Sequence, residues 1–314
     1  MKEKESAMEA PFTIRPFNDS LADAEGLLAV ERATFDESPY TPEQVRAMLV
    51  EGPQRAWLAV QNEGVAGFAI GFPVAGLHGS WWEVDLLAVH PDWRGRRLGH
   101  RLIEAAMAHG AGVARKARAL VADDNGASEQ AFLRAGFRVI PGDRELFILR
   151  PGETARRNPT RWNGHVREAS SRSEAMEWLA CLPGAGPPAG FAPERWGDET
   201  GDGPRAIGLT LLLAEQRPDL GPARPAGCAE LIEVQTLLYH GMWIESLRAA
   251  SPGACGTLVE QAVERVFGAG LDEIGMVVQG QDWTMQRALR GAGFRSLGGF
   301  RWLVAQMPDG SVLS

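Results

Sequence analysis

The sequence predicts an α/β protein made of two related domains, and three observations support this prediction. The 314 residues are about twice a typical domain length of roughly 150 residues. Strand-like stretches alternate with stretches of helical periodicity in the first half, and short signatures of that half recur in the second. We therefore expect one domain at residues 11–150, a linker at 151–164 and a second domain at 165–314.

The elements of the first domain follow the order β-α-α-β-β-β-α-β-α-β. Strands are expected at 12–17, as a pair at 56–72 that turns at 62–64, at 81–91, at 117–123 and from 137 onwards. Helices are expected at 21–35, from 42, at 98–109 and at 125–135. Thr41 with Pro42 and, further on, Asn125 are typical helix starts, and Gly136 is a typical helix end.

Composition excludes several classes of protein. The net charge is −8 and is shared evenly, with 17 Lys and Arg against 21 Asp and Glu in residues 1–150. Neither half is basic, so we expect no nucleic-acid partner. We also expect no membrane span, because no apolar run approaches about 18 residues, and the N-terminus lacks a signal-peptide core. Cys181, Cys228 and Cys255 share no metal-ligand spacing, so we expect free thiols, no metal and a cytoplasmic location.

Positive charge and glycine gather where a predicted strand becomes a helix, in the stretch RGRRLG at 94–99, which we call the arginine–glycine turn. A helix start leaves about four N–H groups unpaired and carries the positive end of the helix dipole. Glycine lets such a backbone approach a phosphate closely, and arginines bind the phosphate by charge-assisted hydrogen bonds. The turn therefore indicates a site for a phosphate-bearing anion.

The same stretch resembles the acetyl-CoA-binding motif of the GNAT superfamily of N-acetyltransferases, Arg/Gln-x-x-Gly-x-Gly/Ala, with Arg97 in place of its first glycine. About thirty residues later, NGASEQAFLRAGF at 125–137 is similar to the second signature of that superfamily. The resemblance covers residues 11–150. It implies two tandem GNAT-like domains, each with a mixed, mostly antiparallel sheet flanked by helices and a splayed V between strands 4 and 5.

The resemblance also implies acetyl-CoA as cosubstrate and the residues that hold it. The pantetheine arm would lie in the V and the pyrophosphate on the turn. The implied binding residues are Leu87, Ala88, Val89, Arg94, Gly95, Arg96, Arg97, Leu98, Gly99, His100, Asn125 and Phe132.

Acetyl transfer to an amine needs a base, because an ammonium group is not a nucleophile. Glu83 and Asp85 alternate on one strand, so both side chains leave the same face, and their proximity should raise one pKa. The sequence does not rank the two. The tyrosine that usually serves as general acid in the superfamily falls at Phe132, which leaves Tyr40 or solvent water as proton donor.

The second half reads as a repeat that has lost the phosphate site. The pattern His-Gly-x-Trp-x-Glu occurs at 78–83 and 240–245, which aligns Glu245 with Glu83. The stretch from the proline after the strand to the aligned helix leucine is five residues shorter in the second copy, and it reads PGACGTL at 252–258, without any arginine. The second strand is also one residue shorter, and we interpret the extra residue of the first copy as a β-bulge that splays its strands. A long loop is expected at 182–205.

Together these observations predict an N-acetyltransferase that uses a strand carboxylate as base. The acceptor would be a small-molecule amine such as a polyamine, amino sugar or amino acid, or else a protein amine. Two alternatives remain at this point: a CoA-binding sensor or scaffold of weak activity, and transfer of another acyl group. We expect one CoA per chain, bound by the first domain.

Overall fold

The computed structural model describes residues 11–35, 39–62, 64–77, 79–152, 162–182, 209–216 and 224–307. We call residues 11–152 the first half and residues 162–307 the second half. Most of the predicted linker, and the long loop predicted at 182–205 apart from Leu182, lie outside the described residues. Within the described ranges, no helix is both long enough and apolar enough to cross a membrane. The three cysteines are free thiols: Cys228 and Cys255 are buried, whereas Cys181 is exposed.

The first half contains every element that the sequence predicts, in the predicted order. Its elements are β1 (Thr13–Pro16), α1 (Leu21–Thr34), α2 (Pro42–Glu51), β2 (Arg55–Gln61), β3 (Gly64–Gly76), β4 (Gly79–Val89), a 3-10 turn (Pro91–Trp93), α3 (Leu98–Gly110), β5 (Lys116–Ala122), α4 (Gly126–Arg134), β6 (Arg138–Val139) and β7 (Arg144–Leu149). Thr41 caps α2 in a capping box with Gln44, and Asn125 caps α4. The strand expected from 137 is short, and the longer strand β7 follows it.

The second half repeats this plan from β8 onwards. Its elements are β8 (Gly164–Glu168), α5 (Arg172–Cys181), β9 (Leu209–Gln216), β10 (Arg224–Gln235), β11 (His240–Ala249), α6 (Pro252–Gly268), β12 (Glu273–Gln279), α7 (Trp283–Gly291) and β13 (Arg295–Gln306). Gly136 after α4 and Gly293 after α7 both adopt positive φ, as helix-ending glycines do. The predicted duplication is confirmed at the level of the fold.

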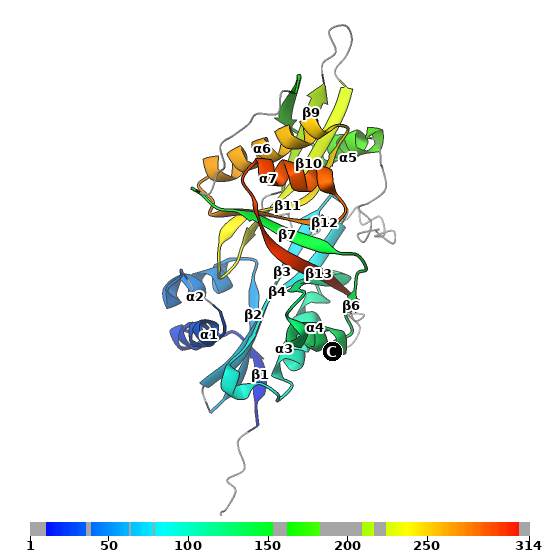
Figure 1. Ribbon diagram of the computed structural model, residues 1–314. Helices are drawn as coiled ribbons and strands as arrows, with labels where there is room; N and C mark the ends of the chain where they lie inside the picture. Colours follow the sequence, from blue (N-terminus) through cyan, green and yellow to red (C-terminus); the bar gives the residue numbers. More distant parts are fainter. Residues whose placement is uncertain are drawn as a thin grey trace, which may run out of the picture.

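The two halves join into one sheet by exchanging their last strands. The order of the described strands is β1-β2-β3-β4-β5-β13-β7-β12-β11-β10-β9-β8. Strand β13 of the second half pairs with β5, and β7 of the first half pairs with β12. Figure 1 shows β13 (red) and β7 (green) crossing at the middle of the molecule, with α1 to α4 around one end of the sheet and α5 to α7 around the other. The domain boundary between residues 150 and 165 therefore remains a prediction from the sequence, and the two halves share one sheet.

Two hairpins reinforce the exchange, because each reaches into the apolar core of the other half. Leu77, at the tip between β3 and β4, packs in a cluster of α5, β9 and β10 residues. Leu237, at the tip between β10 and β11, packs under α1 and α2. Polar contacts hold the first tip as well: Glu230 accepts a hydrogen bond from the Leu77 amide, and Arg172 donates to the Gly76 and Leu77 carbonyls. The cores of the two halves are therefore interlocked.

The predicted V between the fourth and fifth strands is present. Strand β4 pairs with β5 in parallel only at Trp82 and Glu83, and the two strands diverge beyond that point. The other edge of β4 stays paired with β3 as far as Val89. One edge of β4 beyond Glu83 is thus left without a sheet partner among the described strands.

Candidate active site

The arginine–glycine turn lies at the open end of the V and leads directly into α3. Arg94, Gly95, Arg96 and Arg97 are all exposed, whereas Leu98 is buried beneath them. The Arg96 guanidinium lies 5.0 Å from the centre of the Trp93 ring, which fixes its position by a cation–π contact. The turn thus presents several cations to solvent at one helix end.

Arg97 occupies the position where the superfamily motif has glycine, and it adopts the backbone conformation that glycine would favour. Its φ is 60° and its ψ is 20°, in the left-handed region. A non-glycine residue in this region costs about 1 kcal/mol. Arg97 therefore adopts, at the position of the motif glycine, a backbone conformation that glycine would reach without this cost.

The first turn of α3 is free to bind an anion. Arg97 is the N-cap residue of this helix, and its side chain makes no capping hydrogen bond to the helix amides. A Cβ added at Gly99 would lie 3.7 Å from both Ala131 and Leu87, so this glycine faces the space between β4 and α4. These features fit a pyrophosphate on the helix end and a chain of atoms running along Leu87, Ala88 and Val89.

The other predicted cofactor residues lie around the same space. The Nδ1 atom of His100 is buried and has no hydrogen-bond partner within the described part of the chain. The Asn125 side chain accepts a hydrogen bond from the Ser128 amide. Phe132 is buried and packs edge-to-face on Phe137, with ring centres 5.0 Å apart. Phe132 therefore packs in the core and is also a candidate wall residue of the cofactor site.

The two predicted carboxylates, Glu83 and Asp85, line one cavity of about 310 Å³ at the closed end of the V. Residues of both halves form its walls. The polar side chains on its surface also include Arg118, Tyr239, Glu245 and Glu273. The structure thus brings both predicted bases to one place, as the strand alternation suggested.

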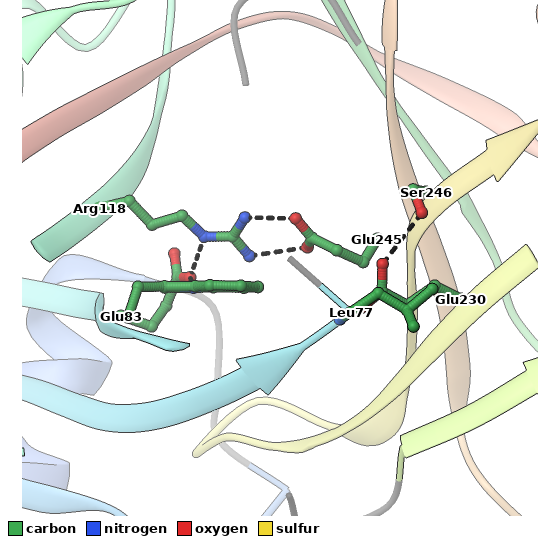
Figure 2. A network of polar contacts seen from close by, with 7 residues as sticks. Leu77, Glu83, Arg118, Glu230, Glu245 and Ser246 are labelled. Atoms are coloured by element: carbon green, nitrogen blue, oxygen red, sulfur yellow. Dashed lines mark hydrogen bonds and ion pairs between the residues drawn. The ribbon is translucent and has the colours of Figure 1, made fainter. Parts of the chain in front are cut away.

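Glu83 belongs to a buried ionic cluster that joins the two halves (Figure 2). Arg118 of β5 donates through Nε to Glu83 and through its two terminal nitrogens to Glu245 of β11, at 2.7 and 2.9 Å. Its guanidinium lies between the Trp81 and Trp302 rings, 4.1 and 4.3 Å from their centres. We call these five residues the Arg118 cluster. The Glu83 carboxylate also accepts a hydrogen bond from Trp81 at 2.9 Å, so it is held in place.

Asp85 has a different environment. Ile70 pairs with Leu86 and Gly71 pairs with Val84, which leaves Asp85 as the extra residue of a β-bulge. Its half-buried side chain makes no hydrogen bond or ion pair to the described residues. Bulges often re-aim a side chain near an active site. Here the bulge gives the cavity a carboxylate with unused acceptor atoms.

Electrostatics separates the two carboxyl groups further. Burial, with a smaller contribution from the Glu83 charge, raises the pKa of Asp85 to about 7. Burial also raises the pKa of Glu83, but the Arg118 guanidinium opposes that rise. Asp85 is therefore the group that can gain and lose a proton near neutral pH.

The two tyrosines lie in different places. Tyr40 precedes α2 and packs against the apolar cluster beneath α1 and α2, and it does not line the cavity. Tyr239 does line the cavity, and burial together with the Asp85 and Glu273 charges raises its pKa well above the ordinary value. The structure thus brings Tyr239, and not Tyr40, to the two carboxylates.

Sequence reasoning missed Arg118 and the cavity walls of the second half. One signal was present, because Arg118 interrupts the otherwise apolar strand ARALVA at 117–122. An arginine in a buried strand needs a partner, since an unpaired buried charge is very costly. The partner Glu245 comes from residues far along the chain, which only the folded arrangement reveals.

In the second half, a tryptophan side chain occupies the position that corresponds to the ion pair of the first half. In the ladder between β11 and β12, Trp243 pairs with Gly275 at the position where Glu83 pairs with Arg118. A Cβ at Gly275 would lie only 2.8 Å from the Trp243 ring, so the indole occupies that space. An aromatic side chain therefore stands where the first half has an ion pair.

The strand pairing corrects two expectations about the repeat. Leu231 pairs with Ile244 and Glu230 pairs with Ser246, which makes Glu245 the extra residue of a second bulge. Glu245 therefore corresponds in space to Asp85, and its sequence alignment with Glu83 is wrong by two residues. The second strand also keeps its bulge, so the residue that it lacks is not the bulge of the first strand.

The shortened region lies between strand and helix, as predicted. Residues 90–97 join β4 to α3, whereas only residues 250–251 join β11 to α6. Ser251 caps α6 by accepting from the Ala254 amide, and Trp162 lies against the same helix start, 3.2 Å from a Cβ built at Gly253. The helix end that would face a second pyrophosphate is thus capped and covered.

Comparisons with known proteins agree with this geometry. Residues 24–137 match the acetyltransferase (GNAT) family. No curated protein matches the chain. These residues include the V, the arginine–glycine turn and both cavity carboxylates of β4.

Solved structures resemble the chain over nearly its whole length. A GCN5-related N-acetyltransferase from Sphaerobacter thermophilus is 19% identical and aligns with a TM-score of 0.58, over 97% of this chain and 99% of that one. A tandem GNAT protein from the clavulanic acid biosynthesis pathway is 13% identical with a TM-score of 0.54, over 95% and 99%. A putative acetyltransferase from Pyrococcus horikoshii is 12% identical with a TM-score of 0.50, over 98% and 94%. At these identities the likeness shows the fold, and it supports the tandem arrangement.

Proposed function

We propose, from the match of residues 24–137 to the acetyltransferase (GNAT) family, that the chain transfers an acetyl group from acetyl-CoA to a small-molecule amine with Asp85 as general base. The observation that carries the proposal is the environment of Asp85. This carboxyl group lines the cavity, has no partner among the described residues and titrates near pH 7. A general base works best when its pKa lies near the operating pH.

The arginine–glycine turn would hold the cosubstrate. The uncapped amides of α3 and the exposed guanidinium groups would bind the pyrophosphate. The free edge of β4 would bind the amide groups of the pantetheine arm. From Val89 back to Asp85 the strand spans about 13 Å at roughly 3.3 Å per residue, which leads the arm towards the cavity.

The reaction needs three events at this place. The Asp85 carboxylate accepts a proton from the ammonium group, directly or through one water. The freed nitrogen lone pair attacks the thioester carbonyl carbon and forms a C–N bond. The C–S bond then breaks, and the thiolate leaves with the electron pair and takes up a proton. The nitrogen of the new C–N bond gives its second proton to solvent, which leaves a neutral amide and a thiol.

The proton for the thiolate would come from solvent or from Tyr239. Tyr239 lines the same cavity as Asp85, and its raised pKa keeps the hydroxyl group protonated at neutral pH. Tyr40, the candidate from the sequence, packs elsewhere. We therefore favour Tyr239 over Tyr40 if a side chain serves as general acid.

The alternative of a CoA-binding sensor rests on one observation. Phe132 has no proton to give at the position where the superfamily usually has tyrosine, and it is buried against Phe137. A sensor would bind acetyl-CoA without consuming it. Measurement of thiol release from acetyl-CoA in the presence of amines separates the two functions.

The substitution Asp85→Asn tests the role of the base. We expect kcat/KM to fall about 100-fold while acetyl-CoA affinity persists, because only proton transfer is lost. In the wild type, kcat/KM should rise with pH through about 7, and this rise should disappear in Asp85→Asn. Glu83→Gln serves as the comparison, because its carboxylate is engaged by Arg118, and the pH dependence should remain in that variant. Full activity in Asp85→Asn would remove Asp85 from the mechanism.

Stability measurements show whether Asp85→Asn still folds. A carboxyl group whose pKa is raised in the folded state lowers stability as pH rises from its unfolded pKa, about 4, to its folded pKa, about 7. The wild type should lose stability across that range. Asp85→Asn lacks this loss, so we expect it to be the more stable protein at pH 8, by about 1–3 kcal/mol in urea unfolding.

A further inference from the structure

The walls of the cavity beside Asp85 are mostly apolar and come from both halves. The first half contributes Phe72, Val74, Leu120, Leu146 and Ile148. The second half contributes, among others, Ile232, Val234, Leu238, Trp243, Phe300 and Trp302. The exchange of β7 and β13 and the interlocked hairpins bring these side chains together, so neither half forms this cavity alone.

The charged groups of the cavity are almost all engaged with one another. Glu83 and Glu245 bind Arg118, and Glu273 binds Arg150 at 2.6 Å. Among the carboxylates that line the cavity, Asp85 is the one that makes no ion pair to the described residues. An occupant therefore meets one negative group in a surface that otherwise offers apolar contacts.

This distribution discriminates between kinds of amine. A second ammonium group would need a second unengaged carboxylate, and the described walls offer only Asp85. The hydroxyl groups of a sugar would lose water without gaining enough partners, which disfavours their burial in this cavity. The carboxylate of an amino acid would lie in an acidic cavity, where like charges repel.

We infer that the acceptor is a compact primary amine with one cationic nitrogen on an aromatic or branched aliphatic body. The inference rests on the proposed function, because it names the substrate class of the same site. The ammonium group would face Asp85, and the apolar body would lie among the walls of the second half. A cavity of about 310 Å³ lies at the lower end of ligand sites, roughly 300–1,000 Å³, which suits a small body.

Initial-rate kinetics with a panel of amines tests the inference. The apolar probes are 2-phenylethylamine and cyclohexylmethylamine, and the polar probes are spermidine, glucosamine and lysine. We expect kcat/KM for the apolar probes to exceed that for the polar probes by at least about 100-fold. Equal or better use of a polar amine would overturn the inference and leave the acetyltransferase function standing.

A binding measurement separates failure of the inference from failure of the proposed function. Trp243 and Trp302 line the cavity, so an occupant should change the tryptophan fluorescence. Saturable binding of 2-phenylethylamine without acetylation would contradict the proposed function and support the substrate class. If the apolar probes are neither bound nor acetylated, the proposed substrate class is overturned.

A charge placed in the cavity wall gives a matched pair of variants. Leu297 lines the cavity and is 43% exposed, so a lysine is accommodated there without burying its charge. Leu297→Lys should raise KM for 2-phenylethylamine at least about 10-fold through repulsion of the ammonium group, with KM for acetyl-CoA within about twofold. Val50 on α2 is 44% exposed and lies outside the cavity, so Val50→Lys should change neither constant. An unchanged amine KM in Leu297→Lys would show that the acceptor binds elsewhere.

Discussion

The two halves of the molecule share one fold and differ at the places where a cosubstrate and a base would act. The first half has an uncapped helix α3 behind a turn of exposed arginines, whereas Ser251 caps α6 and Trp162 covers its start. Both halves keep a β-bulge with a carboxylate. Asp85 in the first bulge has no partner among the described residues, while Glu245 in the second binds Arg118.

This difference shows how one half of a duplicated fold can become the support for the other. The second half places Glu245, Tyr239 and Trp302 at the cavity of the first half. Its own equivalent space is filled by Trp243 over Gly275. The second half thus contributes walls and charges to a cavity for which the first half supplies the proposed base, beside the arginine–glycine turn proposed to bind the pyrophosphate.

The largest effect should follow from breaking the Arg118 cluster. Arg118→Leu leaves the carboxylates of Glu83 and Glu245 buried without their cation, so we expect a loss of about 3–5 kcal/mol in the free energy of unfolding. Arg301→Leu is the matched control, because Arg301 also bridges two carboxylates but is 42% exposed, and it should cost at most about 1 kcal/mol. Equal losses in urea unfolding would show that burial does not make the Arg118 cluster more important for stability than the exposed bridge of Arg301.

The next effect concerns the two helix starts. Gly99→Asp places a negative side chain where the pyrophosphate would bind, so CoA affinity in calorimetry should fall at least about 100-fold, or roughly 3 kcal/mol. Gly99→Ala should bind almost as well as the wild type, because its Cβ makes ordinary contacts at 3.7 Å. Ser251→Asp keeps a good cap on α6 and should leave the affinity unchanged.

The same titrations report how many sites the chain has. We expect saturation near one equivalent of CoA in the wild type, because only α3 has an open start among the two equivalent helices. Two equivalents, or a loss of affinity in Ser251→Asp, would contradict the assignment of the site to the first half.

The smallest effect should come from Arg97, which adopts a left-handed conformation within the turn. Arg97→Gly relieves a backbone cost of about 1 kcal/mol, so we expect a gain in unfolding free energy of up to that amount. CoA affinity should change less than about fivefold if the backbone amide, and not the side chain, is the main contact. A clear loss of stability would mean that Arg97 makes a contact worth more than the strain.

The amino-acid sequence was enough to predict the elements of the first half and the place of the arginine–glycine turn between β4 and α3, and its resemblance to the GNAT superfamily implied the V. Local contacts explain why these predictions succeeded. Thr41 and Asn125 cap their helices, and Gly136 follows the end of α4 with a positive φ. Each of these features involves residues only a few positions apart. Glu83 and Asp85 reach one cavity because both lie on one strand, where alternate residues share a face. Such periodicities depend on neighbouring residues in the chain and can therefore be recognised in the sequence.

Which carboxylate has unengaged acceptor atoms, and what surrounds it, depends on contacts that form only in the folded chain. The exchange of β7 and β13 places Glu245 and Trp302 against Arg118, and Arg118 in turn engages Glu83. Glu245 and Trp302 lie more than a hundred positions from Arg118 in the chain, and Glu83 lies 35 positions from it. The energies of these contacts depend on desolvation and on distances that no local pattern encodes. The sequence alignment of Glu245 with Glu83 is wrong by two residues for the same reason, since strand register is fixed by the facing strand and not by the sequence of one strand alone.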